Sequence, residues 1–576
     1  MNSLWQNRNF REDGLALVIF FTGVHLLYSK TVHAGFVTDF TGLLERLDGA
    51  PFRDFLICFG FPALHQVTNF FLYVFVKTFS TNGLPWYLVF TSLHVANGFL
   101  GFLLGKKIFA GAGIEAPSVA AAIASSLFLF SPYGADAVVW KVCFNFLFCT
   151  SLMLGSLLFL LNYLERNRLS SLLWSHGLFL VALFTFELAV ALPLLALTLS
   201  FWWRNAQSKN GQLPLPGRQV FSQNGFSNGE KTIFSKIVLP QVGMLTGYFI
   251  LNKILLGAWV GHYGESVHLQ LDMQTITSNC LKYFTKYLCF WRDWPHSYKE
   301  NLMQFFEKPV VAWSALVFGL LLLGAGVVFY KKLSSQLRVA GLFWVLFFLA
   351  LAPVSNLYVA WILQGENDRY GYFASLFFFL GLAALFQFFH RYIRYGLFVC
   401  LLMISVFYLN RMTIYWQESA RIVEGLLDDF RWEEAPEVYV LAFPENYQGV
   451  PVFKDFSRQN LALKHTLKYL AGKDVRGTFY QVAQFNMTGP EDGVSVTMDS
   501  TGMFNVQFNQ WGNWWWLHGI GTWNYETDQY RFTVDGNGSQ VKMNQAPAPG
   551  AVFIFSNGAA WGEVENGQFL RSGPAQ

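Results

Sequence analysis

Charged side chains are scarce in this sequence: Asp, Glu, Lys and Arg make up only 13% of its 576 residues. A water-soluble globular chain carries roughly twice that share, so that class is excluded. Hydrophobic residues reach 53%, with 61 Phe and 20 Trp. Apolar runs of about twenty residues, long enough to cross a bilayer as a helix, recur between Leu15 and Leu409. We therefore predict a polytopic membrane protein.

Cysteine is also sparse, and its spacing excludes several kinds of site. Only Cys280 and Cys289 could be bridged outside the cell, but their offset of nine residues places them on different helix faces, so we expect free thiols. No His/Cys cluster has the spacing of metal ligands, and no Gly-rich phosphate loop is present. We expect no metal, no other cofactor and neither ATP nor nucleotide-sugar chemistry. A net charge of only +4 gives no sign of a nucleic-acid partner.

The apolar runs predict about eleven transmembrane helices. We place them at 14–29, 86–104, 118–132, 138–162, 170–186, 188–203, 237–256, 309–330, 339–356, 370–389 and 395–411. The Lys and Arg residues of the short loops then fall on one side, which puts the N-terminus inside and the C-terminus outside. The first run follows Arg8 and Arg11 without a small-residue cleavage site, so we expect a retained span.

The outer loop 30–85 is too apolar to be fully solvated. The stretch "DFTGLLERLDG" (39–49) spaces its apolar residues at i, i+3, i+4 and i+7, which is typical of a helix lying on a membrane surface. The stretch 66–79 is apolar but short, and it predicts a second interfacial helix. We therefore expect no further span in this loop.

The character of the chain changes after about residue 430. "EVYVLAF" predicts a strand, "SRQNLALKHTLKYLAG" an amphipathic helix, and the remainder short alternating strands broken by turns. We predict an all-α membrane bundle over 1–429 and a small extracytoplasmic α+β or β-rich domain over 430–576. The tryptophan-rich stretch 509–523 could build the core of that domain or present aromatic rings at its surface.

A single acid, Glu187, interrupts a long apolar stretch. The 32 residues from Leu172 to Trp203 exceed one bilayer crossing. A lone carboxylate at membrane depth is costly unless it is paired, hydrated or neutralised. We therefore predict two short helices with Glu187 at their outer turn and Pro193 early in the returning helix. Glu187 then either contacts substrate or braces the turn through a hydrogen bond.

Three other outer turns are predicted to carry charge to the same level. Asp39 begins the first interfacial helix, where it could simply cap exposed N–H groups. Asp136 and Lys141 lie in the turn between the third and fourth spans, where they could pair with each other. Asp368 and Arg369 precede the tenth span, and Arg369 could instead anchor that span. In a bundle, these turns can converge on a pocket open to the outside.

The charged groups of these turns suit a phosphate-bearing substrate. A carboxylate there can act as general base toward a hydroxyl or amine acceptor. Arg369 can bind phosphate through a planar fork, and Lys141 as a point charge. His262, in "GHYG", is a candidate for lining the same cavity, whereas His94 lies in an apolar span and is expected to be a packing histidine.

Several short motifs, in order, resemble the GT-C superfamily of membrane glycosyltransferases, and within it the membrane half of the protein O-mannosyltransferases with TPR tails and their bacterial relatives. The motifs are "FVTDF" (36–40), "TSLHVANGFLGFLL" (91–104), "SLFLFSPYGADAVVWKVCFNFLF" (126–148), "FELAVALPLLALTL" (186–199), "LLGAWVGHYG" (255–264) and "APVSNLYV…ENDRYGYFASLFFFLG" (352–381). The resemblance covers roughly residues 10–410. The C-terminal region carries no TPR-like period.

The resemblance implies an inverting glycosyltransferase in the bacterial cytoplasmic (inner) membrane. It would move a sugar from a polyprenyl-phosphate-linked donor to a protein, lipid or glycan acceptor on the outer side. Asp39 would be the catalytic base, and Arg369, Tyr370 and Tyr372 would face the donor phosphate. We expect the pocket to be lined by Asp136, Glu187, His262 and Asp368.

Three positions depart from the family pattern. Phe40 stands where the family usually has a second acid, Ser131 replaces a turn histidine, and Phe186 replaces a lysine. These departures leave a catalytically inactive scaffold as one alternative. A second alternative is a transporter or flippase for a lipid-linked glycan. It predicts polar residues through the whole thickness of the bundle and symmetric halves, whereas the sequence concentrates polar residues near one face and shows no internal repeat.

Overall fold

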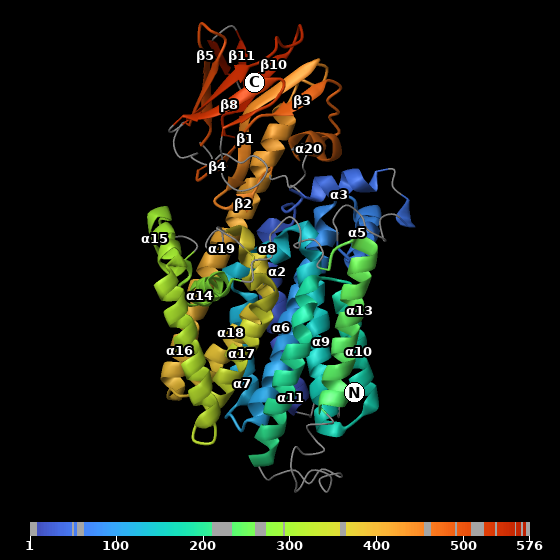
Figure 1. Cartoon of the computed structure of the whole chain (residues 1–576), viewed down its shortest axis with the longest axis vertical. Coiled ribbons are helices and arrows are strands. Elements are labelled where there is room, and N and C mark those ends of the chain that lie inside the picture. Colours follow the sequence, from blue (N-terminus) through green and yellow to red (C-terminus); the bar gives the residue numbers. More distant parts are fainter. Residues whose placement is uncertain are drawn as a thin grey trace.

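The structure, a computed structural model, describes residues 8–37, 39–48, 51–53, 63–209, 233–259, 272–291, 294–357, 365–453, 462–489, 492–508, 524–535, 538–558, 560–565 and 568–571. It is mostly helical, with a β-rich region at the C-terminal end. Two segments singled out above, His262 with its flanking loop and the tryptophan-rich stretch 509–523, lie outside the described residues. The helices form a tall bundle, and the strands lie beyond one end of it (Figure 1).

Each apolar segment predicted as a span contains one helix of the bundle. These are α2 (Arg8–Leu27), α6 (Gly83–Gly111), α7 (Pro117–Leu129), α9 (Phe144–Arg166), α10 (Leu169–Leu183), α11 (Leu192–Lys209), α13 (Leu239–Leu256), α16 (Pro309–Val328), α17 (Ser335–Ser355), α18 (Tyr372–Phe386) and α19 (Arg391–Asp429). Within the described part of the chain, 8 helical segments are long and apolar enough to cross a membrane, or up to 9 if a bent pair counts as one span. The count of eleven stays a prediction.

Three features explain why fewer helices meet that measure. Helix α2 carries Arg11, Glu12 and Asp13 near its start, which is more charge than an apolar span usually has. Helix α10 has only 15 residues, too few for a full crossing on its own. The bent pair joins α7 to residues Pro132–Val139 at an angle of 60°. The bend follows from local sequence, because Pro132 lacks an N–H group and the Ser131 side chain accepts a hydrogen bond from the Tyr133 N–H.

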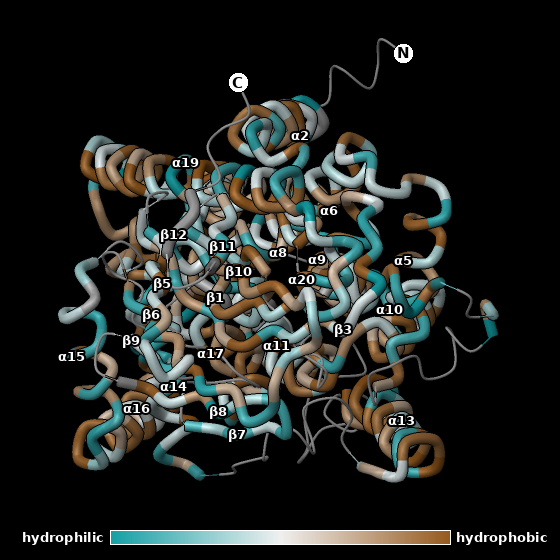
Figure 2. Tube along the Cα trace, turned by 90° about the horizontal axis from the view of Figure 1, so that it is seen from above, coloured by the Kyte–Doolittle hydropathy of each residue, from teal (hydrophilic) through white to brown (hydrophobic). Residues whose placement is uncertain are grey.

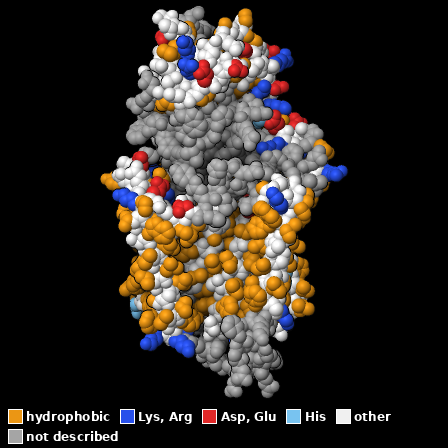
Figure 3. Space-filling view, in the orientation of Figure 1, with side chains coloured by type: hydrophobic (Ala, Val, Ile, Leu, Met, Phe, Trp, Pro, Cys, Tyr) orange, Lys and Arg blue, Asp and Glu red, His pale blue; other side chains and the backbone are white. Residues whose placement is uncertain are grey.

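Apolar side chains cover the outside of the bundle. In the most apolar stretch of α16, only 6% of the residues are buried, so almost all its side chains face outward. Figure 2 shows hydrophobic residues of α13 and α16 at the periphery, and Figure 3 shows hydrophobic side chains across the visible face of the bundle, with Lys and Arg at its lower edge. An apolar surface this large is typical of a protein surface that contacts lipid or other proteins.

Short elements connect the long helices at the two ends of the bundle. They are η1 (Ser29–Thr31), α3 (Asp39–Leu47), α5 (Gln66–Phe79), η2 (Pro132–Gly134), α8 (Ala135–Val139), η3 (Lys141–Cys143), η4 (Glu187–Ala191), the π-helix η6 (Phe234–Val238), α14 (Met273–Cys289), α15 (His296–Glu307) and η8 (Gly365–Gly371). Both helices predicted in the loop 30–85 are present as α3 and α5. Glu187 begins η4, between α10 and α11, as the residue count predicted.

The C-terminal region forms two sheets and one helix, α20 (Ala462–Ala471). The first sheet has the order β12-β11-β10-β1-β2, and β3 and β4 also pair with β1; the second has the order β5-β6-β9-β8-β7. The pairs of β1 with β3, β4 and β10 are parallel, so the first sheet is not a simple antiparallel meander. The strands of the first sheet are β1 (Glu437–Tyr447), β2 (Val450–Pro451), β3 (Thr478–Gln481), β4 (Gln484–Met487), β10 (Val552–Ser556), β11 (Trp561–Glu565) and β12 (Gln568–Arg571). Those of the second are β5 (Val494–Met498), β6 (Phe504–Phe508), β7 (Tyr525–Glu526), β8 (Tyr530–Asp535) and β9 (Gly538–Met543).

Helix α19 connects the bundle to the sheets without a break. It has 39 residues, whereas the predicted span ended at 411, and its second half continues beyond the bundle (Figure 1). The Trp561 indole donates a hydrogen bond to the Leu426 carbonyl at 2.7 Å, and the Ser419 hydroxyl donates to the Pro451 carbonyl at 2.5 Å. These bonds fix the sheets to the upper half of α19.

Helix α20 packs against α3, the helix of the first outer loop. The hydroxyls of Thr41 and Thr466 lie 3.3 Å apart, and His465 Nε2 lies 2.8 Å from a Glu45 carboxylate oxygen. The C-terminal region therefore holds the first outer loop in place from above.

Candidate functional site

Two chain segments at the upper end of the bundle meet at Gly35. The Gly35 carbonyl accepts the Lys141 N–H at 3.1 Å. Gly35 has φ +88°, and a Cβ atom on it would lie 2.0 Å from the Val139 carbonyl oxygen. Only glycine fits such a close approach at a positive φ. The residue therefore allows the first outer loop to lie directly against η3.

Lys141 is buried, with 1% of its surface exposed. Its ammonium lies 5.6 Å from the centre of the Phe36 ring and 5.7 Å from that of Phe90. It forms no ion pair with Asp136, and no carboxylate among the described residues pairs with it. Aromatic faces offset part of the cost of burying an ammonium, but a buried cation is stabilised far more by an anion. Lys141 is therefore a buried ammonium whose described neighbours include two aromatic rings.

The Arg369 side chain packs beside Trp140, the residue that precedes Lys141 in the sequence. Its guanidinium carbon is 4.5 Å from the Trp140 ring centre and 5.0 Å from that of Tyr370. The Tyr370 ring in turn lies 5.7 Å from Phe146. These cation–π contacts hold the guanidinium between the two rings. The short helix α8, which precedes Trp140, packs against η8, which carries Arg369.

Asp368 forms a buried ion pair with Lys286 of α14. The two side chains are 0% and 2% exposed, so this pair is shielded from water. The Lys286 ammonium also lies 5.1 Å from the centre of the Tyr133 ring. Burial raises the pKa of the nearby Tyr287 hydroxyl well above its ordinary value, so that group stays neutral. The pair joins η8 to α14 and fixes the backbone next to Arg369.

Tyr372 lies behind this cluster, inside the bundle. Its hydroxyl is 2.7 Å from His94 Nδ1 and 3.2 Å from the Asn97 amide nitrogen. His94 Nε2 lies 3.0 Å from the Leu129 carbonyl, so both ring nitrogens of His94 have partners, as expected of a packing histidine. Asn97 also accepts a hydrogen bond from Ser151 at 2.6 Å. The network joins α6, α7, α9 and α18 and positions the start of α18.

The predicted acids are placed differently from one another. Asp136 is 1% exposed in α8, close enough to the Tyr28 hydroxyl for the two groups to interact electrostatically. Glu187 lies 3.8 Å from His65 Nε2, and the ring of its neighbour Phe186 packs 4.5 Å from Phe146. Through Phe146, the rings of Phe186 and Tyr370 form a chain of aromatic contacts from the turn of Glu187 to η8.

The structure thus brings together some of the predicted residues and not others. Arg369 contacts the rings of Trp140 and Tyr370, and Lys141 and Asp368 adjoin Trp140 and Arg369 in the sequence, where α8 packs against η8. We call these five residues the cluster around Trp140. Asp39 begins α3, whose neighbouring element is η3, but its side chain, like His262, lies outside the described residues. Within the described part of the chain, no group of three or more His, Cys, Asp or Glu could hold a metal ion.

Sequence reasoning missed Trp140 as part of the cluster and Lys286 as the partner of Asp368. The segment 257–308 reads as a mixed polar loop, and nothing in it indicates that Lys286 pairs with an acid eighty-two positions later. One signal was present: Lys282 and Lys286 are four residues apart, so they share one face of α14.

No protein-family model matches the chain, and no curated protein matches it either.

Proposed function

We propose that the chain is a polytopic membrane protein of the bacterial cytoplasmic membrane, with eleven spans and its N-terminus inside. The cluster around Trp140 and the C-terminal sheets then lie outside. The apolar outer surface of the bundle supports this placement (Figure 3), and so do basic residues such as Lys106, Lys107 and Arg166 at the opposite end. An all-apolar helix as exposed as α16 is stable in lipid and unfavourable in water.

We further propose that the protein is a glycosyltransferase that uses a polyprenyl-phosphate-linked sugar. One observation carries this proposal: Lys141 is a buried cation without a carboxylate partner among the described residues, and it directly follows Trp140, whose ring Arg369 contacts. The phosphate of a lipid-linked sugar supplies a negative charge to pair with Lys141. After the sugar has left, the phosphate carries a second negative charge, so its attraction to Lys141 and Arg369 increases. That change favours the products of transfer.

The proposed reaction is an inverting displacement. Asp39 accepts the proton of an acceptor hydroxyl, whose oxygen attacks the anomeric carbon of the sugar. A glycosidic C–O bond forms there, the bond from that carbon to the phosphate oxygen breaks, and its electron pair stays on the polyprenyl phosphate. Lys141, Arg369 and Tyr370 hold the phosphate, while Asp136, Glu187, Asp368 and His262 shape the pocket. We place Tyr372 behind the phosphate rather than on it, because its hydroxyl is bonded to His94 and Asn97.

Binding of the carrier lipid tests this proposal without knowledge of the sugar. We would measure the affinity of the purified full-length protein for undecaprenyl phosphate in nanodiscs, for the native chain and for Lys141→Met. The methionine keeps the length and apolar packing of the side chain but removes its charge. We expect at least tenfold weaker binding. Lys308→Met, a loss of charge at an exposed position of the same end, is the matched control and should bind normally.

Transfer itself is tested with a panel of polyprenyl-phosphate sugars in proteoliposomes, by the release of free polyprenyl phosphate. Asp39→Asn should abolish release while leaving carrier binding unchanged. Full release by that variant would overturn the assigned base, and equal carrier binding by Lys141→Met and the native chain would overturn the phosphate site.

Transport of a lipid-linked glycan is the second candidate function, and one feature favours it. Gln241 and Asn252 of α13 are fully buried, and the Gln241 side-chain amide makes no hydrogen bond to any described residue. With Tyr248 they form a polar face along a helix otherwise exposed to its surroundings. Movement of a fluorescent polyprenyl-phosphate sugar across protein-containing vesicles, without transfer of the sugar, would favour this function.

A further inference from the structure

A cavity lies at the end of the bundle opposite the cluster around Trp140. Its volume is about 910 Å³, and it opens to the surface of the bundle. It is bordered by the last turns of α6 and α9 and the first turns of α2 and α7. A volume of this size is in the range of specific ligand sites in proteins, about 300–1,000 Å³.

The lining of the cavity changes from apolar to polar along the axis of the bundle. Leu100 and Leu103 of α6, with Leu158 of α9, line the part nearer the middle of the bundle. Lys107 and Arg166 line the part nearer its end. Leu100 and Lys107 are separated by about 10 Å along the helix axis. A ligand that fits this gradient has an apolar tail toward the middle of the bundle and a polar head at its end.

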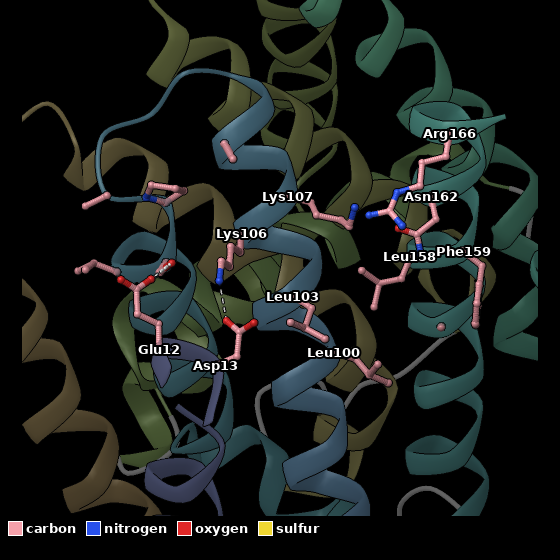
Figure 4. Close-up of a pocket in the computed structure, with 16 residues that line it drawn as sticks. Glu12, Asp13, Leu100, Leu103, Lys106, Lys107, Leu158, Phe159, Asn162 and Arg166 are labelled. Carbon is pink, nitrogen blue, oxygen red and sulfur yellow. Dashed lines mark hydrogen bonds and ion pairs between the residues drawn. The ribbon is translucent and has the colours of Figure 1, made fainter. Parts of the chain in front are cut away.

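The polar part of the cavity carries an excess of positive charge on its α9 side. Figure 4 shows Lys107, Asn162 and Arg166 grouped there, apart from Glu12 and Asp13 on the α2 side. On the α2 side, Asp13 neutralises Lys106 at 2.6 Å. On the α9 side, Glu165 neutralises Lys107 at 2.6 Å, and Arg166 has no carboxylate partner among the described residues. One positive charge is therefore left for an anionic head.

The Glu12 carboxylate does not compete for this charge. It accepts a hydrogen bond from the Ser118 hydroxyl at 2.7 Å, which holds it against the start of α7. The Asn162 side chain lies beside Arg166 in Figure 4 and adds an amide that can donate to phosphate. The arrangement is that of a basic pocket between transmembrane helices at the cytoplasmic side, which suits a phospholipid head group.

We propose that this cavity binds an anionic glycerophospholipid of the inner leaflet, with the phosphate at Arg166 and Lys107 and an acyl chain along Leu103 and Leu158. The site is separate from the site of the proposed transfer reaction, and it rests only on the placement of the bundle in a membrane. The lipid fills an amphipathic cavity that would otherwise expose Leu100 and Leu103 beside charged side chains.

Photo-crosslinking tests the proposal on the full-length protein. The protein is placed in nanodiscs that contain a photoactivatable phosphatidylglycerol or the matched phosphatidylcholine, and labelled peptides are mapped by mass spectrometry. We expect phosphatidylglycerol to label the segments 100–107 and 155–166 in preference to phosphatidylcholine. Arg166→Gln should weaken the binding of phosphatidylglycerol about fivefold, the effect of removing one basic side chain near an anionic head group.

Two variants make the test specific. Arg168→Gln removes a charge at an exposed position of the same end that does not line the cavity, and it should leave labelling unchanged. Ala110→Phe places a ring in the cavity from an exposed position of α6 and should abolish labelling while circular dichroism stays native.

Three results would overturn the proposal. They are equal labelling by the two phospholipids, an equal loss for Arg168→Gln and Arg166→Gln, and displacement of the phosphatidylglycerol by equimolar undecaprenyl phosphate, which would make the cavity a carrier site. Crosslinking requires no glycosyl transfer, so an inactive transferase would leave the result interpretable.

Discussion

The guanidinium of Arg369 stacks on the Trp140 ring at 4.5 Å, and the residue after Trp140 is the buried Lys141. One tryptophan therefore packs against a cation from a distant part of the chain and directly precedes a second, whose ammonium lies over Phe36 and Phe90. Its own position is fixed in turn by the extended backbone between α8 and η3 and by contact with Trp416, whose ring centre lies 6.4 Å away.

Trp140→Leu should weaken the binding of undecaprenyl phosphate more than it lowers stability. Loss of the stacked ring removes a cation–π contact worth about 0.5–2 kcal/mol and frees the guanidinium to rotate. Trp140→Phe keeps a ring and should retain part of the affinity. Affinity is measured in nanodiscs for both variants alongside their thermal midpoints. Equal affinities for Leu and Phe at this position would show that the ring does not orient Arg369.

The ion pair between Lys286 and Asp368 should show strong coupling. Lys286→Met leaves a buried carboxylate uncompensated, which costs about 3–5 kcal/mol when one partner of a buried pair is lost. The double variant Lys286→Met/Asp368→Asn leaves no charge and should recover most of that stability. Thermal unfolding in detergent measures the stability of Lys286→Met, of Asp368→Asn and of the double variant. Additive effects of the two single changes would contradict a direct pair.

The sequence predicted the helices well because each long helix presents an unbroken apolar run, and the length of such a run is a local property. It also predicted the turn at Glu187, since 32 residues cannot fit one crossing. The pairing of Lys286 with Asp368 could not be predicted in this way. It depends on how α14 packs against η8, and no local pattern specifies a contact between segments so far apart.

Neighbouring residues also took different roles for a reason invisible in the sequence. Tyr370 and Tyr372 belong to one motif, yet η8 ends at Gly371 and α18 begins at Tyr372. The change of helix type turns the Tyr372 side chain into the bundle while Tyr370 stays beside Arg369. In a uniform helix, two side chains that are two residues apart are separated by a fixed rotation about the helix axis. That regularity is lost at the junction of η8 and α18.

Tyr372→Phe should therefore lower stability without changing the affinity for undecaprenyl phosphate. The substitution leaves His94 Nδ1 buried without its partner, at a cost of about 1–3 kcal/mol. Thermal unfolding and carrier binding are measured on the same preparation, with His94→Gln as a second change in the same network. A large loss of affinity with an unchanged thermal midpoint would instead place the Tyr372 hydroxyl on the phosphate.

Gly35→Ala should disturb the contact between the first outer loop and η3. Its Cβ would lie 2.0 Å from the Val139 carbonyl oxygen at a residue whose φ is +88°, so either the loop or η3 has to move. We expect a loss of more than about 1 kcal/mol, since both steric contact and backbone strain act. Gly42→Ala in α3 is the control, because a Cβ there meets nothing within 4 Å. It should be neutral or slightly stabilising, and a similar loss for both variants would show that Gly35 has no special role.

The docking of the C-terminal region on the first outer loop is tested by a disulfide. The hydroxyls of Thr41 and Thr466 lie 3.3 Å apart across α3 and α20, so Thr41→Cys/Thr466→Cys should crosslink rapidly on mild oxidation. The experiment uses a background in which the exposed Cys289 and Cys400 are replaced by serine. Crosslinking is read as a shift in electrophoretic mobility that reductant reverses.

Gly42→Cys/Thr466→Cys is the control for that crosslink, because a Cβ at position 42 points into open space and should not reach α20. If both pairs formed disulfides at the same rate, α20 would be moving freely over α3 rather than resting on it. If only the first pair forms, the start of α3, where Asp39 lies, is held from above by the C-terminal region. Carrier binding by the crosslinked protein should then equal that of its reduced form, since the disulfide preserves an arrangement the protein already has.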